Sequence, residues 1–400
     1  MDSTFTWLDY SEHERRKMLD VIKLFSERET RDELGVGSVR DAFADLLFPG
    51  TSTIQTRARY FFFVPWIYLD LEKKRIDPSK IADRARQQET NLIKTLLETG
   101  ETEGVIGKLA QDKLQRLPSN IYWQGLGALG IRLFSGSQDQ YHRSLSRYYA
   151  HITQVKQQRN EEMLDLKAIS NWHVGLPSAP VDFPNKASFS LTKPEAEFLR
   201  EQIQTQSRNS LMAYWVSSKN PPPQSDFPWD AIPSNFLQDL RIQLSHAQNF
   251  SEALHGAALL YNLLLAEQIP DKDLVDIYRQ ELSEWEKLIK DRIGTLKGWD
   301  IKKFWEIAYS INPRIPRFTR MFVEEWLELA LAQTRPSKIF DDHSARELIR
   351  NRERFLKRGQ SRLENRRALD LWTGAAGTGR LNYRWRIAQS LIKDIHEGLK

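Results

Sequence analysis

The chain has 400 residues, of which 28% are charged and 40% hydrophobic, the balance of a folded globular protein with ample core-forming material. It contains no cysteine, which excludes disulfides, thiolate catalysis and cysteine-based zinc sites and agrees with a cytoplasmic location. The net charge is +5, and we see neither a signal peptide nor an apolar segment of membrane-spanning length, so we expect no membrane contact.

Apolar residues recur at helical spacing through the first quarter of the chain. This pattern predicts helices over residues 9–34, 38–48 and 78–98. Between the second and third of these, a Pro49-Gly50 turn precedes an almost wholly apolar run from Tyr60 to Leu69. Such a run must be buried, and we expect a helix that is bent or interrupted at Pro65.

Two arginines, Arg57 and Arg59, stand at the entrance of this apolar run. Guanidinium groups at the mouth of an aromatic core either pair with carboxylates or face a ligand. We favour carboxylate pairing and keep a ligand-binding role as the alternative.

Two glycine-rich stretches resemble nucleotide-binding motifs but lack the context that these motifs need. Residues 125–130 (GLGALG) match GxGxxG inside a helical pattern with no strand before it, so close helix packing explains them better. Residues 374–380 (GAAGTGR) lack the Lys-Ser/Thr pair of a phosphate-binding loop. We expect a turn there instead.

The organisation of the chain follows from its helix and linker signals. Thr192 and Glu195 predict a capped helix start, and Pro221, Pro222 and Pro223 predict an extended linker over residues 217–228. We therefore expect an N-terminal helical domain, residues 1–216, and a C-terminal helical domain, residues 229–400. The predicted fold class is mainly α and multi-helical, in two domains or lobes with little β structure.

The second half of the chain is helical in pattern throughout. Helices are predicted over residues 236–244, 251–269 and 273–293. Beyond them, aromatic residues recur around Pro313 and Pro316 and predict an aromatic helical hairpin: Trp299, Phe304, Trp305, Phe318, Phe322 and Trp326. We favour a core role for them and keep a stacking platform as the alternative.

Basic residues concentrate near the C-terminus. From Arg335 to Arg386 there are fourteen Lys/Arg against six Asp/Glu, an excess of +8, so the remainder of the chain carries about −3. Six arginines follow one another at a spacing of four: Arg346, Arg350, Arg354, Arg358, Arg362 and Arg366.

On one helix, a four-residue step places each arginine about 40° further round than the last. The row would then wind onto the apolar side, where Arg352 also points, so either the helix breaks near Gly359 or these arginines are buried against carboxylates at an interface. A winding row of cations suits a phosphate backbone. The alternatives are a protein interface and a plain solvated face. The predicted nucleic-acid contacts are these six arginines together with Arg367, Arg380, Arg384 and Arg386.

No catalytic or metal-binding motif is present. The eight histidines form no HExxH or paired ligand spacing, and there is no GxSxG elbow. We therefore expect no cofactor and no metal site, and we favour a non-catalytic protein, although distant carboxylates could still assemble a nuclease-like centre.

Four stretches carry a family resemblance: FPGTSTIQTRARYFFFVPW (48–66), IYWQGLGALGIRLF (121–134), FSEALHGAALLYNLLLAE (250–267) and LNYRW (381–385). They resemble a bacterial and archaeal family of unknown function that is encountered in antiphage defence islands. The resemblance covers most of the chain and implies partners such as a helicase or a phospholipase-D-like nuclease. It carries over no catalytic residue.

We therefore expect a non-catalytic, DNA- or RNA-binding accessory subunit of an antiphage defence complex. The alternatives are a scaffold that docks an acidic protein partner and a metal-dependent nuclease with a non-local site.

Overall fold

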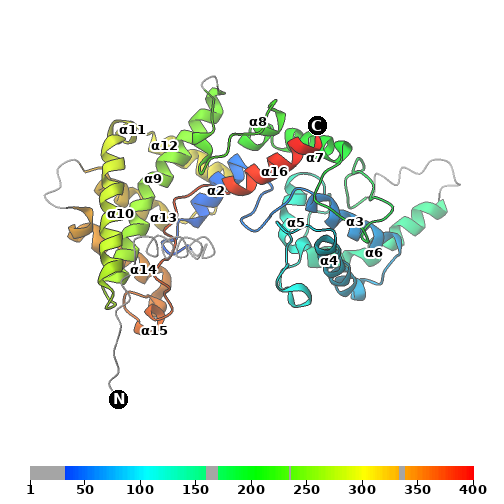
Figure 1. Cartoon of the computed structure of the whole chain (residues 1–400), viewed down its shortest axis with the longest axis horizontal. Coiled ribbons are helices and arrows are strands. Elements are labelled where there is room, and N and C mark those ends of the chain that lie inside the picture. Colours follow the sequence, from blue (N-terminus) through cyan, green and yellow to red (C-terminus); the bar gives the residue numbers. More distant parts are fainter. Residues whose placement is uncertain (1–31, 159–169, 234–235, 333–337) are drawn as a thin grey trace, which may run out of the picture. The chain divides into compact units, whose positions relative to one another are not determined.

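The computed structural model describes residues 32–158, 170–233, 236–332 and 338–400, with the side chains of residues 112 and 156–158 left aside (Figure 1). Within these ranges the chain is 63% helical and has fifteen α-helices and no strand. An isolated antiparallel bridge joins Arg132 and Trp172. The predicted mainly α fold is confirmed. The helix predicted over residues 9–34 lies almost wholly outside the described residues.

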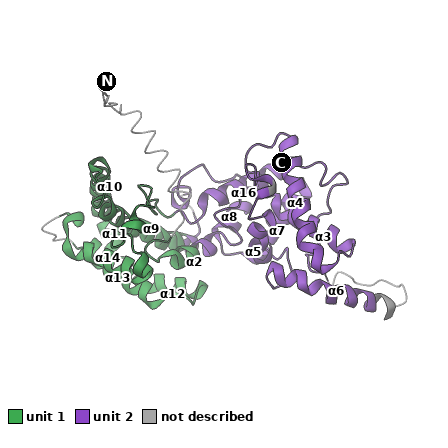
Figure 2. Ribbon diagram, turned by 90° about the horizontal axis from the view of Figure 1, so that it is seen from below, with its two compact units in different colours: residues 1–43, 241–381 green, residues 44–240, 382–400 purple. Residues whose placement is uncertain are grey.

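The chain forms two compact units that do not follow the predicted domain order (Figure 2). Unit 1 is Met1–Phe43 with Arg241–Leu381, and unit 2 is Ala44–Leu240 with Asn382–Lys400. The Pro-rich segment 217–228 lies inside unit 2. Its Ser225 exchanges hydrogen bonds with the Gln389 side chain and accepts one from the Trp385 indole. The prolines do exclude a helix, but side chains of the C-terminal helix tie the segment down.

Unit 2 is built around the aromatic helix α3 (Tyr60–Lys73), which packs on its neighbours α4 and α5. Every residue from Tyr60 to Tyr68 is buried, and Pro65 lies inside the helix without ending it. Unit 2 also contains the last turn of α2 (Gly37–Leu47), α4 (Ile81–Glu98), α5 (Pro118–Ala128), α6 (Gln138–Gln158), α7 (Lys193–Gln206), α8 (Leu211–Ser217) and α16 (Trp385–Gly398). The predicted buried aromatic helix is confirmed.

The C-terminal helix α16 completes unit 2 by packing on α7 and α8 (Figure 1). Helix α7 begins at the predicted cap, where the Glu195 carboxylate accepts from the Thr192 backbone N–H at 2.8 Å. The carboxylate of Glu195 also pairs with Arg59, so one side chain both caps α7 and holds the entrance of α3.

The glycines of GLGALG serve close packing, as predicted. A Cβ atom at Gly125 would lie 2.3 Å from the backbone carbonyl oxygen of Gly50 in the Pro49-Gly50 turn. Only glycine lets α5 approach that turn so closely, while Gly50 itself adopts φ 79°.

Unit 1 is assembled on the long helix α9 (Gln238–Ala266). The two helices predicted over residues 236–244 and 251–269 are therefore one continuous helix. The indole of Trp285 on α10 lies against Gly256 and donates to the Glu252 carbonyl. The remaining helices of unit 1 are α10 (Lys272–Asp291), α11 (Ile293–Lys297), α12 (Ile301–Ile311), α13 (Arg317–Ala330), α14 (His343–Lys357) and α15 (Arg366–Leu369).

The predicted aromatic hairpin consists of α12 and α13, and its aromatic residues form core with one exception. Trp305 and Trp326 are fully buried, whereas Phe318 is 57% exposed. Among all described helices, none combines the length and apolar character needed to cross a membrane.

Candidate nucleic-acid interface

The row of arginines begins on α14, which is shorter than an unbroken spacing of four would require. Asp342 caps its first turn by accepting from the Ala345 amide, and Ala345 and Ile349 form its buried face. The helix ends at Lys357, because the backbone of Arg358 turns to φ 50°, which no helical residue adopts.

The predicted break near Gly359 is therefore present, and the six arginines do not share one helix. Arg346, Arg350 and Arg354 lie on α14, Arg358 caps it, Arg362 lies in the following turn and Arg366 begins α15.

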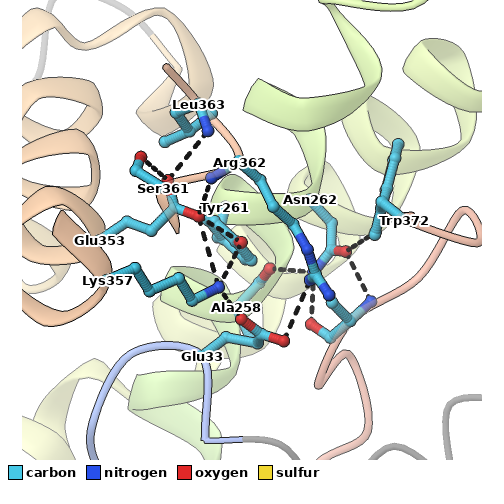
Figure 3. A network of polar contacts seen from close by, with 11 residues as sticks. Glu33, Ala258, Tyr261, Asn262, Glu353, Lys357, Ser361, Arg362, Leu363 and Trp372 are labelled. Carbon is cyan, nitrogen blue, oxygen red and sulfur yellow. Dashed lines mark hydrogen bonds and ion pairs between the residues drawn. The ribbon is translucent and has the colours of Figure 1, made fainter. Parts of the chain in front are cut away.

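A buried carboxylate explains why the chain turns where it does (Figure 3). Glu353 points inward from α14 and accepts from the Ser361 hydroxyl, from the Tyr261 hydroxyl of α9 and from two backbone amides, those of Arg362 and Leu363. Burial alone would raise the pKa of Glu353, but these hydrogen bonds outweigh it and hold the pKa below its ordinary value. The carboxylate thus stays charged and ties the turn to α9.

A second buried acid neutralises the cations of this network. Glu33 pairs with Lys357 and, at 3.0 Å, with the guanidinium of Arg362. Arg362 is itself buried, so its predicted role as a phosphate contact is wrong. Its partner carboxylate lies more than 300 positions away in the sequence, where spacing arguments do not reach.

Three further arginines of the predicted set are largely enclosed by internal partners. Arg346 pairs with Glu267 and donates to the Phe340 carbonyl. In unit 1 Arg380 pairs with Glu252 at 3.0 Å, and in unit 2 Arg384 pairs with Asp45 at 2.6 Å. The turn over residues 374–380 therefore fastens Arg380 to α9, where Glu252 lies. Each of these three arginines is therefore engaged inside its own unit and helps to hold that unit together.

Arg57 and Arg59 also pair with carboxylates, the alternative that the sequence favours. Arg57 binds Asp394 of α16 through its Nε and Nη2 atoms, at 2.9 to 3.1 Å, and Arg59 binds Glu195 at 2.9 Å. Both therefore anchor elements of unit 2 to the start of α3.

What remains of the predicted set is exposed. Arg350 and Arg354 have 37% and 54% of their side-chain surface exposed and pair with Glu347 and Glu364. Such surface pairs contribute about 0–1 kcal/mol, so a phosphate can replace the carboxylate at little cost. Arg366 and Arg386 make similar exposed pairs, with Asp370 and Asp226. The side chains of Arg358 and Arg367 are exposed, and neither makes a hydrogen bond or ion pair with another described residue.

Four residues on α14 and at its C-cap lie close together in the sequence and keep exposed side-chain surface. We call Arg350, Arg354, Phe355 and Arg358 the α14 stripe. From Arg350 to Arg354 the helix axis advances about 6 Å, and Arg358 follows at the C-cap. Because phosphates follow one another every ~3.4 Å along each strand of a duplex, Arg350 and Arg354 are spaced to contact separate phosphates of one strand, and Arg358 adds a cation at the end of the helix. The stripe is thus a short cationic track on unit 1.

The family relationship is the remaining observation. Residues 2–398 match the model of a family described as "Family of unknown function (DUF6361)". The chain belongs to this family. No curated protein and no solved structure matches the chain. Membership of DUF6361 covers nearly the whole chain and therefore both units, the α14 stripe included.

Two buried acids in unit 2 escaped the sequence interpretation. Glu72 accepts hydrogen bonds from Tyr141, Asn171 and Trp172, and burial raises its pKa. Glu89 lies on the buried face of α4 and accepts from the Ser119 amide at 2.7 Å. The burial of Glu89 could have been predicted from helical spacing. Glu89 stands four residues after Ala85 and four before Ile93, and all three lie on the buried face of α4. Within the described ranges no three His, Asp or Glu side chains gather as metal ligands would.

The buried position of Glu89 makes a testable prediction about pH. Burial raises the pKa of Glu89 in the folded protein to about 7, whereas in the unfolded chain it is about 4.3. Between these two pH values the unfolded chain has lost the proton and the folded protein still keeps it. Stability should therefore fall as the pH rises from about 4.3 to 7 and then level off. We expect the free energy of unfolding to fall by about 3 kcal/mol more in the wild type than in Glu89→Gln when the pH rises from 5 to 8. Urea unfolding measures this free energy. The exposed Glu98→Gln on the same helix is the control and should follow the wild type. Equal pH profiles for Glu89→Gln and the wild type would show that Glu89 is ionised in the folded protein.

Proposed function

We propose that this protein is a non-catalytic nucleic-acid-binding subunit of a cytoplasmic antiphage defence complex. The observation that supports it best is the α14 stripe, where the half-buried Arg350 and the exposed Arg354 lie on a helix whose other face is buried, and the exposed Arg358 caps that helix. Most protein–nucleic-acid affinity comes from cations placed against phosphates, and this stripe supplies them without disturbing the fold.

The defence context and the partners rest on the resemblance alone. A helicase or a phospholipase-D-like nuclease would supply the chemistry, and this chain would hold the nucleic acid. The two buried acids next to the stripe agree with this division of labour: Glu353 and Glu33 are engaged by hydrogen bonds and cations, so neither is placed to act as a base.

The test is binding of the purified full chain to labelled single-stranded DNA, duplex DNA and RNA. The variant R350Q/R354Q/R358Q removes the cations of the stripe. The control K287Q/K290Q/K297Q removes the same net charge from exposed positions on α10 and α11 of the same unit. We expect the stripe variant to bind on the order of 100-fold more weakly near 0.1 M salt, because three phosphate contacts are lost. The control should stay within a few fold of the wild type.

Two results would overturn the proposal. If the folded wild type binds no nucleic acid at low salt, the remaining alternative is a scaffold that docks an acidic protein partner. Metal-dependent cleavage of a plasmid by the chain alone would favour the nuclease alternative.

A further inference from the structure

Two phenyl rings stand exposed beside the α14 stripe. Phe318 of α13 is 57% exposed and Phe355 of α14 is 54% exposed, and their ring centroids are 5.1 Å apart at an interplanar angle of 50°. Two further apolar side chains are exposed nearby in the sequence. Met321 lies one helical turn after Phe318, and Leu356 follows Phe355 directly. Two large rings that contact each other and still face water contribute little to the core, so burial does not explain the pair.

The rings are held in place by a buried arginine. Arg352 points inward from α14 and donates to the Phe318 carbonyl, to the Thr319 hydroxyl and to the carbonyls of Leu34 and Gly35. Its guanidinium also stacks over the Phe322 ring at 4.9 Å. One side chain of α14 thus ties the first turn of α13 to α14, and this link sets the two helices that carry Phe318 and Phe355 side by side.

The charges next to the pair suit a polyanion. Arg354 precedes Phe355, and Arg317 precedes Phe318. Arg317 and Arg358 are exposed, and their side chains make no hydrogen bond or ion pair with the residues that the structure describes. Exposed aromatic rings set among cations are the arrangement by which proteins hold single-stranded nucleic acid, with bases on the rings and phosphates on the cations.

We propose that Phe318 and Phe355 form a base-stacking platform and that the α14 stripe takes single-stranded nucleic acid in preference to duplex. This proposal rests on the nucleic-acid-binding function proposed above. Bases within a duplex are stacked on each other and offer no free face, whereas the bases of a single strand do. The arginines can contact the phosphates of a duplex or of a single strand, whereas the two rings can stack only on the bases of a single strand.

The variant F318L/F355L tests the platform, because leucine keeps the surface apolar and removes the rings. We expect it to bind a single-stranded oligonucleotide at least tenfold more weakly than the wild type, with duplex binding and the slope of binding against salt unchanged. L371A, which trims another exposed apolar residue of unit 1, is the control and should behave as the wild type. Thermal unfolding of each variant establishes that it is folded.

An abasic strand of equal length separates stacking from charge. Wild type should bind it about as weakly as F318L/F355L binds the normal strand, and the variant should lose nothing further on it. A fluorescent 2-aminopurine base should be quenched by the wild type and not by the variant.

The two proposals fail in different ways. If wild type binds no nucleic acid at all, the proposed function falls and the platform with it. If R350Q/R354Q/R358Q abolishes binding while F318L/F355L and the abasic strand change nothing, the function stands and the platform is overturned. A concentration-dependent dimer that F318L/F355L dissociates, without any effect on single-strand binding, would also overturn it and assign the rings to self-association.

Discussion

Glu353→Ala should lower the free energy of unfolding by about 3–5 kcal/mol, the range found when one partner of a buried charge network is removed. The substitution leaves the Tyr261 and Ser361 hydroxyls and the amides of Arg362 and Leu363 without their acceptor in a buried site. It also takes one of the two carboxylates away from Lys357. Urea unfolding followed by tryptophan fluorescence measures the loss.

The control lies on the same helix. Glu347 is exposed and makes one surface pair with Arg350, so Glu347→Ala should change stability by less than about 0.5 kcal/mol. Glu353→Gln should fall between the two, because the amide keeps one acceptor and turns an N–H group toward donors. A loss below 1 kcal/mol for Glu353→Ala would mean that the turn after α14 does not depend on this carboxylate.

Asp394→Ala should lower the free energy of unfolding by about 2–4 kcal/mol. The substitution removes the acceptor for two N–H groups of the Arg57 guanidinium and for the buried backbone amide of Ala58. The loss stays below that of Glu353→Ala because Arg57 is partly exposed and regains water. The change breaks the link between the C-terminal helix α16 and the entrance of α3, both in unit 2.

Thermal unfolding of Asp394→Ala and of its exposed neighbour variant Lys393→Ala makes the comparison. We expect a clear fall in the midpoint for the first and almost none for the second. Asp394→Asn should be intermediate, because the amide oxygen still accepts from Ala58. Equal midpoints for the alanine variants would show that the Arg57–Asp394 pair is dispensable for the fold.

Local patterns predicted the elements of this protein well. The apolar run of α3, the capping box at Thr192 and the close approach at Gly125 each depend on residues near one another in the chain, which periodicity and spacing can read. The inward direction of Arg352 was also predicted, because it follows from its place relative to Ile349 on one helix.

Pairings between distant residues could not be predicted in the same way. Two ion pairs, Arg362–Glu33 and Arg57–Asp394, form between residues that are far apart in the sequence and meet only after the chain has folded. The sequence alone does not distinguish an arginine that will find such a partner from one that will stay exposed. The end of α14 at Arg358 depends on Glu353 capturing later amides. Phe318 belonged to a pattern of core aromatics, and its exposure depends on where α14 lies.

The salt dependence of binding tests the nucleic-acid function most directly. The wild type and R350Q/R354Q/R358Q should be compared on a labelled single strand and on duplex DNA from 50 to about 200 mM salt. Removal of three phosphate contacts should make the slope of log affinity against log salt shallower by about 2 on a single strand and about 3 on a duplex, with no such change in K287Q/K290Q/K297Q. Parallel lines for wild type and the stripe variant would contradict a phosphate-binding role for α14.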